Sequence, residues 1–262
     1  MRSILLNART RLTARFVLLH LGLVVIVAML FALWLHIPDS SVLAVIGTGL
    51  LGSLISVLTF GGEAVLLRRL AGSTQGNLLA GAIALLLAAA LWLASWLWLN
   101  HIGESDFFMQ AAGYANSRFP HSLRNLFTFA NILRLLGWVA LALKWLSAGI
   151  LLAIAVPFAQ SKRPVRSSLR VLLSISYWLV LAASAIVVTM ITARLVEWTP
   201  GHGLRVEALS LVLRLVVVVI VDAVLVCYVL AVIATLVVRS EDGQATPEGS
   251  PERSQPRSVD MP

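Results

Sequence analysis

The sequence predicts an all-α membrane protein: a polytopic bundle of six transmembrane helices with an amphipathic helix on the outer side. Three observations predict this class. Of the 262 residues, 59% are hydrophobic and only 12% are charged, against roughly 25% charged in an ordinary soluble domain. Six apolar segments are long enough for the hydrocarbon core, which takes about 20 helical residues to cross. The basic residues lie between these segments, as topology signals at a membrane surface do.

The first two spans are separated by the turn signal Pro38-Asp39-Ser40. Arginines precede the first span as in a secretory signal, but its apolar stretch exceeds the roughly 7 to 15 residues of a signal core, so we expect an uncleaved signal anchor. The transmembrane domain is predicted to cover residues 1–239. Its spans are expected at about 16–35, 42–66, 78–99, 135–159, 171–193 and 208–238.

Lys and Arg are distributed unequally between the two ends of these spans. One side carries five, namely Arg118, Arg124, Arg134, Arg194 and Arg205. The other side carries thirteen, namely Arg2, Arg9, Arg11, Arg15, Arg68, Arg69, Lys162, Arg163, Arg166, Arg170, Arg239, Arg253 and Arg257. The positive-inside rule therefore predicts that both termini are cytoplasmic.

The basic residues also bear on the compartment and on nucleic-acid binding. Nearly all of them are Arg, with only Lys144 and Lys162 as lysines. This bias is typical of a GC-rich bacterial genome and favours a bacterial inner membrane. The formal charge of +8 would suggest nucleic-acid binding in a soluble protein. Because the charges alternate with membrane spans, we expect the lipid bilayer, and not nucleic acid, as their partner.

Two regions lie outside the predicted spans. Residues 240–262 consist mainly of Pro, Ser, Glu and Arg, with too few apolar residues to offset the entropy of ordering, and predict a disordered cytoplasmic tail. The outer loop 100–134 carries apolar residues at helical spacing from Leu123 through Leu126, Phe127 and Ala130. This stretch is interpreted as an interfacial helix that continues into the fourth span. A re-entrant element lining a cavity is the alternative.

Lys144 and Asp222 are the charged residues that the predicted spans place deepest in the membrane. Lys144 lies about 24 Å from the cytoplasmic end of the fourth span and Asp222 about 26 Å from that of the sixth, at about 1.5 Å per residue. Because an isolated charge at this depth costs about 2.5 to 3.5 kcal/mol, we hypothesise an intramembrane charge pair joining the two spans. Such a pair is interpreted either as a structural link or as an ion relay.

Two other polar residues are predicted near the cytoplasmic surface. Glu63 lies close to the end of the second span, where it can reach water or pair with Arg68. His20 stands alone about one turn inside the first span and is interpreted as a packed or snorkelling residue.

Small residues form a stripe on the second span. Gly49 with Ser53, and Gly52 with Ser56, are separated by three residues each. This small-xxx-small spacing allows a second helix to approach closely. We interpret it as helix packing within the bundle rather than as a ligand groove or a dimer face.

The sequence lacks the residue patterns of the common enzyme and metal sites. Four histidines are predicted on the outer side, but they come from separate segments without ligand spacing. There is no Walker A loop and no Gly-x-Ser-x-Gly elbow. Asp222 has no second carboxylate at its depth for aspartyl chemistry, and the single Cys227 makes no Cys-based metal site or disulfide framework. We therefore expect no enzyme activity, no cofactor and no metal.

Three function classes remain, of which a membrane enzyme acting on lipid or an envelope precursor is supported only by the histidines and acidic residues of the predicted outer side. The first is a subunit or scaffold of a membrane complex that holds a membrane-protein partner or a second copy of the chain. The alternative is a transporter or permease subunit that uses the Lys144/Asp222 pair.

Overall fold

The computed structural model describes residues 1–37, 41–72, 76–118, 120, 127–198 and 203–242. Within these ranges every regular element is helical, which confirms the predicted all-α class. The elements are α1 (Arg2–Arg11), α2 (Ala14–Leu35), α3 (Val42–Ser56), the π-helix η1 (Val57–Gly61), α4 (Gly62–Ala71), α5 (Leu78–Glu104), α6 (Asp106–Arg118), α7 (Phe129–Gln160), α8 (Pro164–Leu172), α9 (Ile175–Glu197) and α10 (Leu204–Asp242).

Six helices of the described chain are long and apolar enough to cross a membrane, as predicted, and they indicate a multi-pass membrane protein. They comprise Ala14–Leu35, Val42–Ala71, Leu78–Glu104, Phe129–Gln160, Ile175–Glu197 and Arg205–Glu241. Several are longer than predicted because polar residues continue the helix beyond the apolar stretch. The fourth, for example, begins at Phe129, where the Thr128 hydroxyl accepts a hydrogen bond from the Asn131 backbone N–H.

The fifth predicted span begins too early. Residues 171 and 172 belong to the separate helix α8, and the span itself starts at Ile175. The chain turns between the two helices at Leu173 and Ser174, and Ser174 is the N-cap of α9. The apolar run extends across this turn, so hydropathy did not reveal it.

Helix α1 was not predicted. It packs against α10, with Ala8 buried and Ile4, Leu5 and Leu12 in contact with the core. The same helix binds the end of α4, because the Arg11 guanidinium donates hydrogen bonds to the backbone carbonyls of the last two residues there, at 3.3 and 3.1 Å. The helical spacing of its apolar residues was the signal that could have predicted it.

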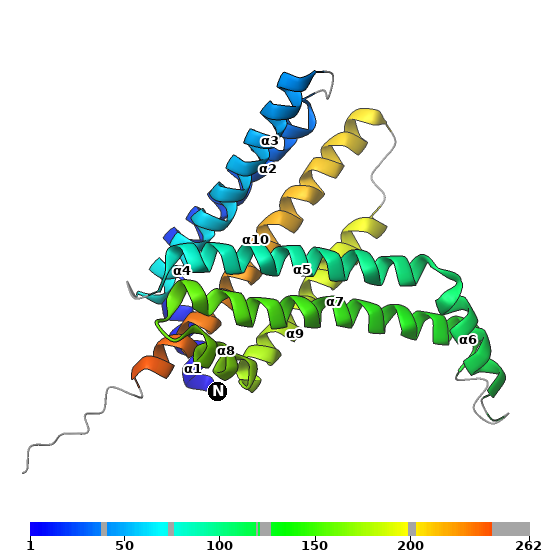
Figure 1. Ribbon diagram of the computed structural model, residues 1–262. Coiled ribbons are helices and arrows are strands. Elements are labelled where there is room, and N and C mark those ends of the chain that lie inside the picture. The colour runs from blue at the N-terminus through cyan, green and yellow to red at the C-terminus, as the bar shows by residue number, and fades with distance from the viewer. Residues whose placement is uncertain (38–40, 73–75, 119, 121–126, 199–202, 243–262) are drawn as a thin grey trace, which may run out of the picture.

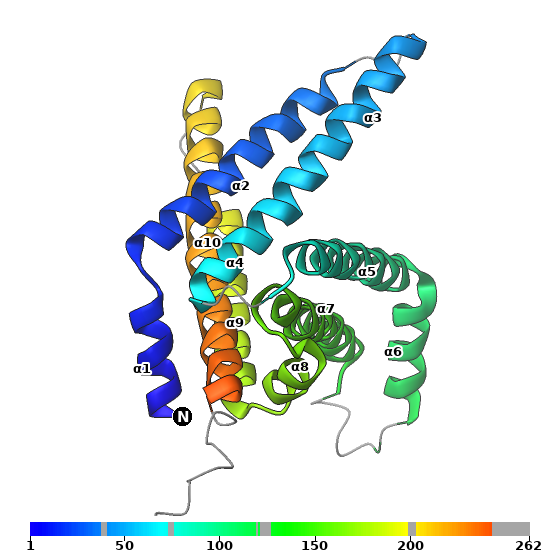
Figure 2. The same cartoon turned by 60° about the vertical axis from the view of Figure 1, so that its left-hand side comes forward.

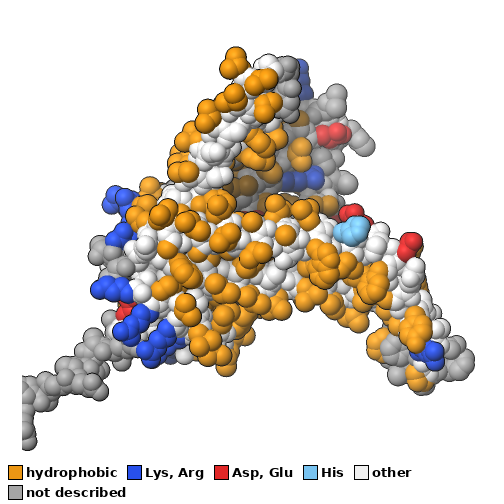
Figure 3. Space-filling model, in the orientation of Figure 1, with side chains coloured by type: hydrophobic (Ala, Val, Ile, Leu, Met, Phe, Trp, Pro, Cys, Tyr) orange, Lys and Arg blue, Asp and Glu red, His pale blue; other side chains and the backbone are white. Residues whose placement is uncertain are grey.

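The spans form three hairpins, α2–α3, α5–α7 and α9–α10, that meet at one end of the molecule and diverge from there (Figures 1 and 2). At that end α10 lies in the middle, in contact with α1, α2, α4, α7, α8 and α9. The buried core is concentrated there, with Leu67, Val156 and Ile233 fully covered. Figure 3 shows Lys and Arg gathered at this end, whereas hydrophobic side chains cover the outward course of the hairpins. We call it the basic end; its basic residues are Arg11, Arg68, Arg69, Lys162, Arg163, Arg166, Arg170 and Arg239.

Glycines set the distance between α7 and its neighbours. A Cβ at Gly81 of α5 would lie 2.7 Å from the Cβ of Ala159, and a Cβ at Gly149 of α7 would lie 2.2 Å from Cδ2 of Leu181. Both distances are too short for a side chain. The absence of a Cβ therefore lets α5 and α9 approach α7 closely.

The loop between the third and fourth spans contains a helix that the sequence analysis did not predict. Helix α6 covers Asp106–Arg118 and packs against α5 and α7. The predicted interfacial helix began at Leu123, and residues 121–126 lie outside the described part of the chain, while its later residues belong to α7. The predicted tail also begins later than expected, because α10 continues to Asp242; residues 243–262 are outside the described ranges.

Candidate functional site

The most distinctive polar contact in the spans joins α2 to α4. The imidazole Nδ1 of His20 lies 3.0 Å from the Oε2 of Glu63, which is within ion-pair and hydrogen-bond distance. His20 is buried, with 7% of its surface exposed, and the Glu63 side chain is largely covered. Because a carboxylate oxygen accepts a hydrogen bond, Nδ1 carries the proton in this arrangement.

The helix that carries Glu63 changes its winding just before it. Residues Val57–Gly61 form the π-helix η1, and α4 begins at the next residue. A π-turn inserts one extra residue into a helix and rotates everything that follows about the helix axis. The position of η1 therefore sets which face of α4 presents Glu63 to α2.

Two further side chains surround this pair. The ring of Phe16 stacks on the His20 ring, with centroids 6.4 Å apart and planes 14° apart. Cys227 of α10 is fully buried in the same hydrophobic core as Phe16. The arrangement can hold a proton between two titratable groups and can lock α2 to α4.

The sequence interpretation of these two residues was incomplete. Glu63 is not only an interfacial group that reaches water or Arg68, and His20 does not stand alone, because each is the other's partner. The residues are 43 positions apart in the chain. Each was recognised as an ionisable group inside a span, but no sequence signal indicated that the two helix faces meet.

Lys144 is directed towards α5. Its ammonium group donates a hydrogen bond to the Asn100 side-chain oxygen and lies 4.3 Å from the centroid of the Trp96 ring. Both partners suit a cation, since an amide oxygen accepts a hydrogen bond and an indole face attracts positive charge. The contact joins the two helices of the α5–α7 hairpin, from the middle of α7 to the last turns of α5.

Asp222 is half-buried on α10. Among the described residues, no ion pair within 4.0 Å joins it to Lys144. The structure therefore does not bring together the two residues of the predicted charge pair. The physical reason is that Lys144 lies on the face of α7 that contacts α5, the helix with which α7 packs most extensively.

The predicted packing residues of α3 divide between two faces. Gly52 faces α2, where a Cβ would lie 3.7 Å from the indole nitrogen of Trp34, and Ser56 is half-buried. Gly49 and Ser53 are exposed, and a Cβ at Gly49 would contact nothing within 4 Å. The serine hydroxyls bond back to their own helix, to the Gly49 and Gly52 carbonyls at 2.9 Å.

No metal centre is found in the part of the chain that the structure describes, where no three His, Cys, Asp or Glu side chains cluster. Of the four histidines predicted on the outer side, His36 and His101 are described and exposed, whereas His121 and His202 lie outside the described ranges.

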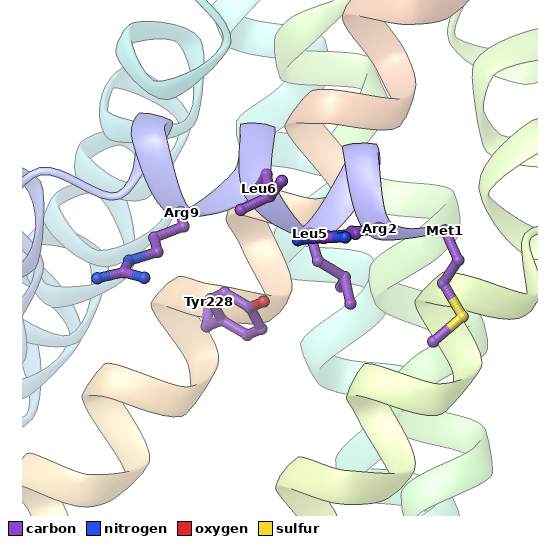
Figure 4. A pocket seen from close by; sticks show the side chains of 6 residues that line it. All are labelled: Met1, Arg2, Leu5, Leu6, Arg9 and Tyr228. Atoms are coloured by element: carbon purple, nitrogen blue, oxygen red, sulfur yellow. The ribbon is translucent and has the colours of Figure 1, made fainter.

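An open cavity of about 490 Å³ lies between α1 and α10 (Figure 4). Tyr228 of α10 points towards α1, and the apolar side chains of Met1, Leu5 and Leu6 form much of the remaining lining. Arg2 and Arg9 complete it. The lining carries no pair of groups arranged for acid–base or nucleophilic chemistry.

Comparison of this chain with protein-family models, with curated proteins and with solved structures finds no match.

Proposed function

We propose that this protein is a non-catalytic subunit or scaffold of a membrane complex, spanning a bacterial inner membrane with both termini in the cytoplasm. The observation that carries the proposal is the division of the fold into a packed end and diverging hairpins (Figure 1). The basic end holds the buried core. Such a fold would keep three separate hairpins in fixed positions and offer their outward faces to other membrane proteins.

Helix α3 supports this proposal most directly. In the most apolar stretch of Val42–Ala71, none of the residues is buried by the rest of the chain. Its outward face includes Leu50, of which 68% is exposed, and the small residues Gly49 and Ser53. Within lipid, helix association depends on close contact, and small residues permit it. A face of this composition suits a transmembrane helix of a partner or of a second copy.

The placement of the loops in this proposal follows the distribution of charge. The basic end is on the cytoplasmic side, where the positive-inside rule puts Lys and Arg. Helix α6 then lies at the outer surface, as an interfacial helix with the exposed apolar residues Phe107, Met109 and Tyr114.

Site-specific photocrosslinking in intact membranes tests the proposal. A photoreactive phenylalanine replaces Leu50, which faces away from the chain, or Leu23, which packs against Gly62 within it. We expect Leu50 to give one discrete crosslinked protein band and Leu23 to give crosslinks only within the chain. The mass of the band distinguishes a second copy from another protein. Crosslinks from Leu50 to lipid alone would contradict a subunit role.

The transporter alternative makes a different prediction for the same membranes. Single cysteines beside Lys144 and Asp222 would change their accessibility from the two sides when substrate is added. The proposed scaffold predicts an accessibility that stays fixed. A substrate-dependent change at either position would favour transport over the scaffold.

A further inference from the structure

The cavity between α1 and α10 is an open groove with a largely apolar lining (Figure 4). Its volume of about 490 Å³ lies within the range of about 300 to 1,000 Å³ that is usual for small-molecule sites. We call it the α1 groove; its lining residues are Met1, Arg2, Leu5, Leu6, Arg9 and Tyr228. All of them except Tyr228 belong to the first nine residues of the chain, so the groove depends on how α1 is placed on α10.

The face of α1 that borders the groove is apolar at its centre and basic at both ends. Arg2, Leu5, Leu6 and Arg9 follow the i, i+3, i+4 and i+7 spacing that puts residues on one side of a helix. The two arginines are therefore two turns apart, about 10 Å along the helix axis, with the leucines between them. Ala8, the buried residue of α1, packs into the core. The groove face thus combines an apolar surface with two cations.

Arg2 and Arg9 are available to a ligand. Both are exposed, and neither makes a hydrogen bond, ion pair or ring contact with a residue that the structure describes. Arg11 of the same helix differs from them, because its guanidinium donates to backbone carbonyls at the end of α4. The lining of the groove contains no carboxylate. The arginines therefore give the groove a positive charge that its own lining does not neutralise.

Tyr228 supplies a polar group on the α10 side of the groove. It is half-buried, and Figure 4 shows its ring beside α1, with Arg9 to one side and Arg2 to the other. Its hydroxyl makes no hydrogen bond within the described part of the chain, so its proton is available to a ligand oxygen. A tyrosine with an apolar body and a polar tip is typical of the boundary between acyl chains and headgroups.

The apolar part of the lining distinguishes a lipid from a small anion. Met1 and Leu6 are 63% and 52% exposed, so the chain itself leaves them largely uncovered. An acyl chain lying along the groove would cover them, and the hydrophobic effect favours that contact. A hydrated phosphate ion would leave them uncovered. A helix that carries arginines beside leucines is also typical of the membrane interface.

We infer that the α1 groove binds an anionic phospholipid. Arg2 and Arg9 attract the phosphate group, to which guanidinium groups donate charge-assisted hydrogen bonds. The Tyr228 hydroxyl donates a further hydrogen bond to the headgroup, and an acyl chain lies on the leucines between the arginines. Basic residues on an amphipathic helix recognise anionic lipids in this way. The site does not depend on the proposed scaffold role.

Native mass spectrometry of the full chain in detergent tests the site, with the purification tag at the C-terminus so that α1 is unaltered. The probes are phosphatidylglycerol, phosphatidylcholine with the same acyl chains, and inorganic phosphate. We expect the protein to retain phosphatidylglycerol in preference to phosphatidylcholine. The double variant Arg2→Gln/Arg9→Gln should bind phosphatidylglycerol about thirtyfold more weakly, which is about 1 kcal/mol for each arginine at about 1.4 kcal/mol per tenfold. Tyr228→Phe, which keeps the ring, should bind it about fivefold more weakly.

Three further variants separate a lost site from a general loss of charge or a damaged fold. Arg15→Gln/Arg69→Gln removes the same two charges from exposed positions outside the groove and should bind like the unaltered protein. Arg2→Lys/Arg9→Lys keeps the charge and should keep most of the binding. Leu6→Gln makes the groove more polar at an exposed position and should weaken the binding of phosphatidylglycerol.

Several outcomes would overturn the inference. Equal retention of the two lipids would overturn the site, as would unchanged binding in Arg2→Gln/Arg9→Gln or an equal loss in the control Arg15→Gln/Arg69→Gln. Displacement of phosphatidylglycerol by inorganic phosphate, or unchanged binding in Leu6→Gln, would show that the groove takes a free anion and overturn the lipid assignment. These results are independent of crosslinking from Leu50, so the site and the proposed scaffold role are tested separately.

Discussion

The hydroxyl of Tyr177 in α9 donates a 2.6 Å hydrogen bond to the backbone carbonyl of Gly149 in α7. Tyr177 is fully buried, and the missing side chain at Gly149 makes room for Leu181 and Trp178 from the same helix. A tyrosine hydroxyl, a glycine carbonyl and close helix contact therefore hold the fourth span to the fifth.

Substitution at this crossing should destabilise the protein. Gly149→Ala places a Cβ 2.2 Å from the Leu181 side chain, and overpacking of this kind lowers the free energy of unfolding by about 1 to 3 kcal/mol. Tyr177→Phe should lower it by about 1 kcal/mol, through the lost hydrogen bond. Thermal unfolding in detergent measures both. Gly47→Ala is the control, because a Cβ there contacts nothing within 4 Å. Equal melting temperatures for Gly149→Ala and Gly47→Ala would contradict the described packing.

His20 and Glu63 should depend on each other. Each single substitution to Ala leaves one buried polar group without its partner, at about 1 to 3 kcal/mol. The double variant should therefore lose less unfolding free energy than the two single variants lose together. The difference, measured in a double-mutant cycle, should be about 0.5 to 3 kcal/mol. His101 and Glu104 of α5 are the matched pair of the same residue types, both exposed, and should show no coupling. Additive effects at His20 and Glu63 would mean that the contact contributes nothing to stability.

Lys144 should be coupled to Asn100 and not to Asp222. Lys144→Met removes the donor of the hydrogen bond to Asn100. In a protein that already carries Lys144→Met, the further substitution Asn100→Leu should therefore change the unfolding midpoint little. Lys144→Met and Asp222→Asn should act independently, because no ion pair joins these two residues in the described structure. Two double-mutant cycles on the unfolding midpoint separate the cases. Strong coupling between Lys144 and Asp222 would instead support the intramembrane charge pair predicted from their depths.

Cysteine labelling should reveal the orientation in the membrane. The single cysteine, Cys227, is buried and can be replaced by Ser to give a cysteine-free background. In the proposed orientation, Ser117→Cys at the end of α6 should react with a membrane-impermeant maleimide added to the periplasmic side, whereas Ser3→Cys in α1 should react only after the membrane is opened. Both positions are accessible in the structure, so access to the reagent decides the result. Labelling of Ser3→Cys but not of Ser117→Cys from the periplasmic side would show that the orientation is the opposite of the one proposed.

The amino-acid sequence was sufficient to predict the all-α class and the number of candidate spans. Apolar length is a one-dimensional property, since about 20 consecutive apolar residues are needed wherever the helix later packs. The sequence did not predict helix ends that lie beyond the apolar run, such as the start of α7 at Phe129. It also did not predict the turn inside an apolar run, between Leu172 and Ile175. The amphipathic spacing of α1 was present in the sequence but was not recognised.

Only the tertiary structure decided which polar residues meet. His20 and Glu63 are 43 positions apart and Lys144 and Asn100 are 44 apart, so no local pattern relates them. Matching depths suggested Asp222 as the partner of Lys144, but depth leaves open how each helix is rotated about its axis. That rotation is set by close packing, such as that of Gly81 on Ala159, and by the π-helix before Glu63. Hydropathy along the chain does not show how a helix is rotated or which polar residues meet, because both depend on contacts between distant segments.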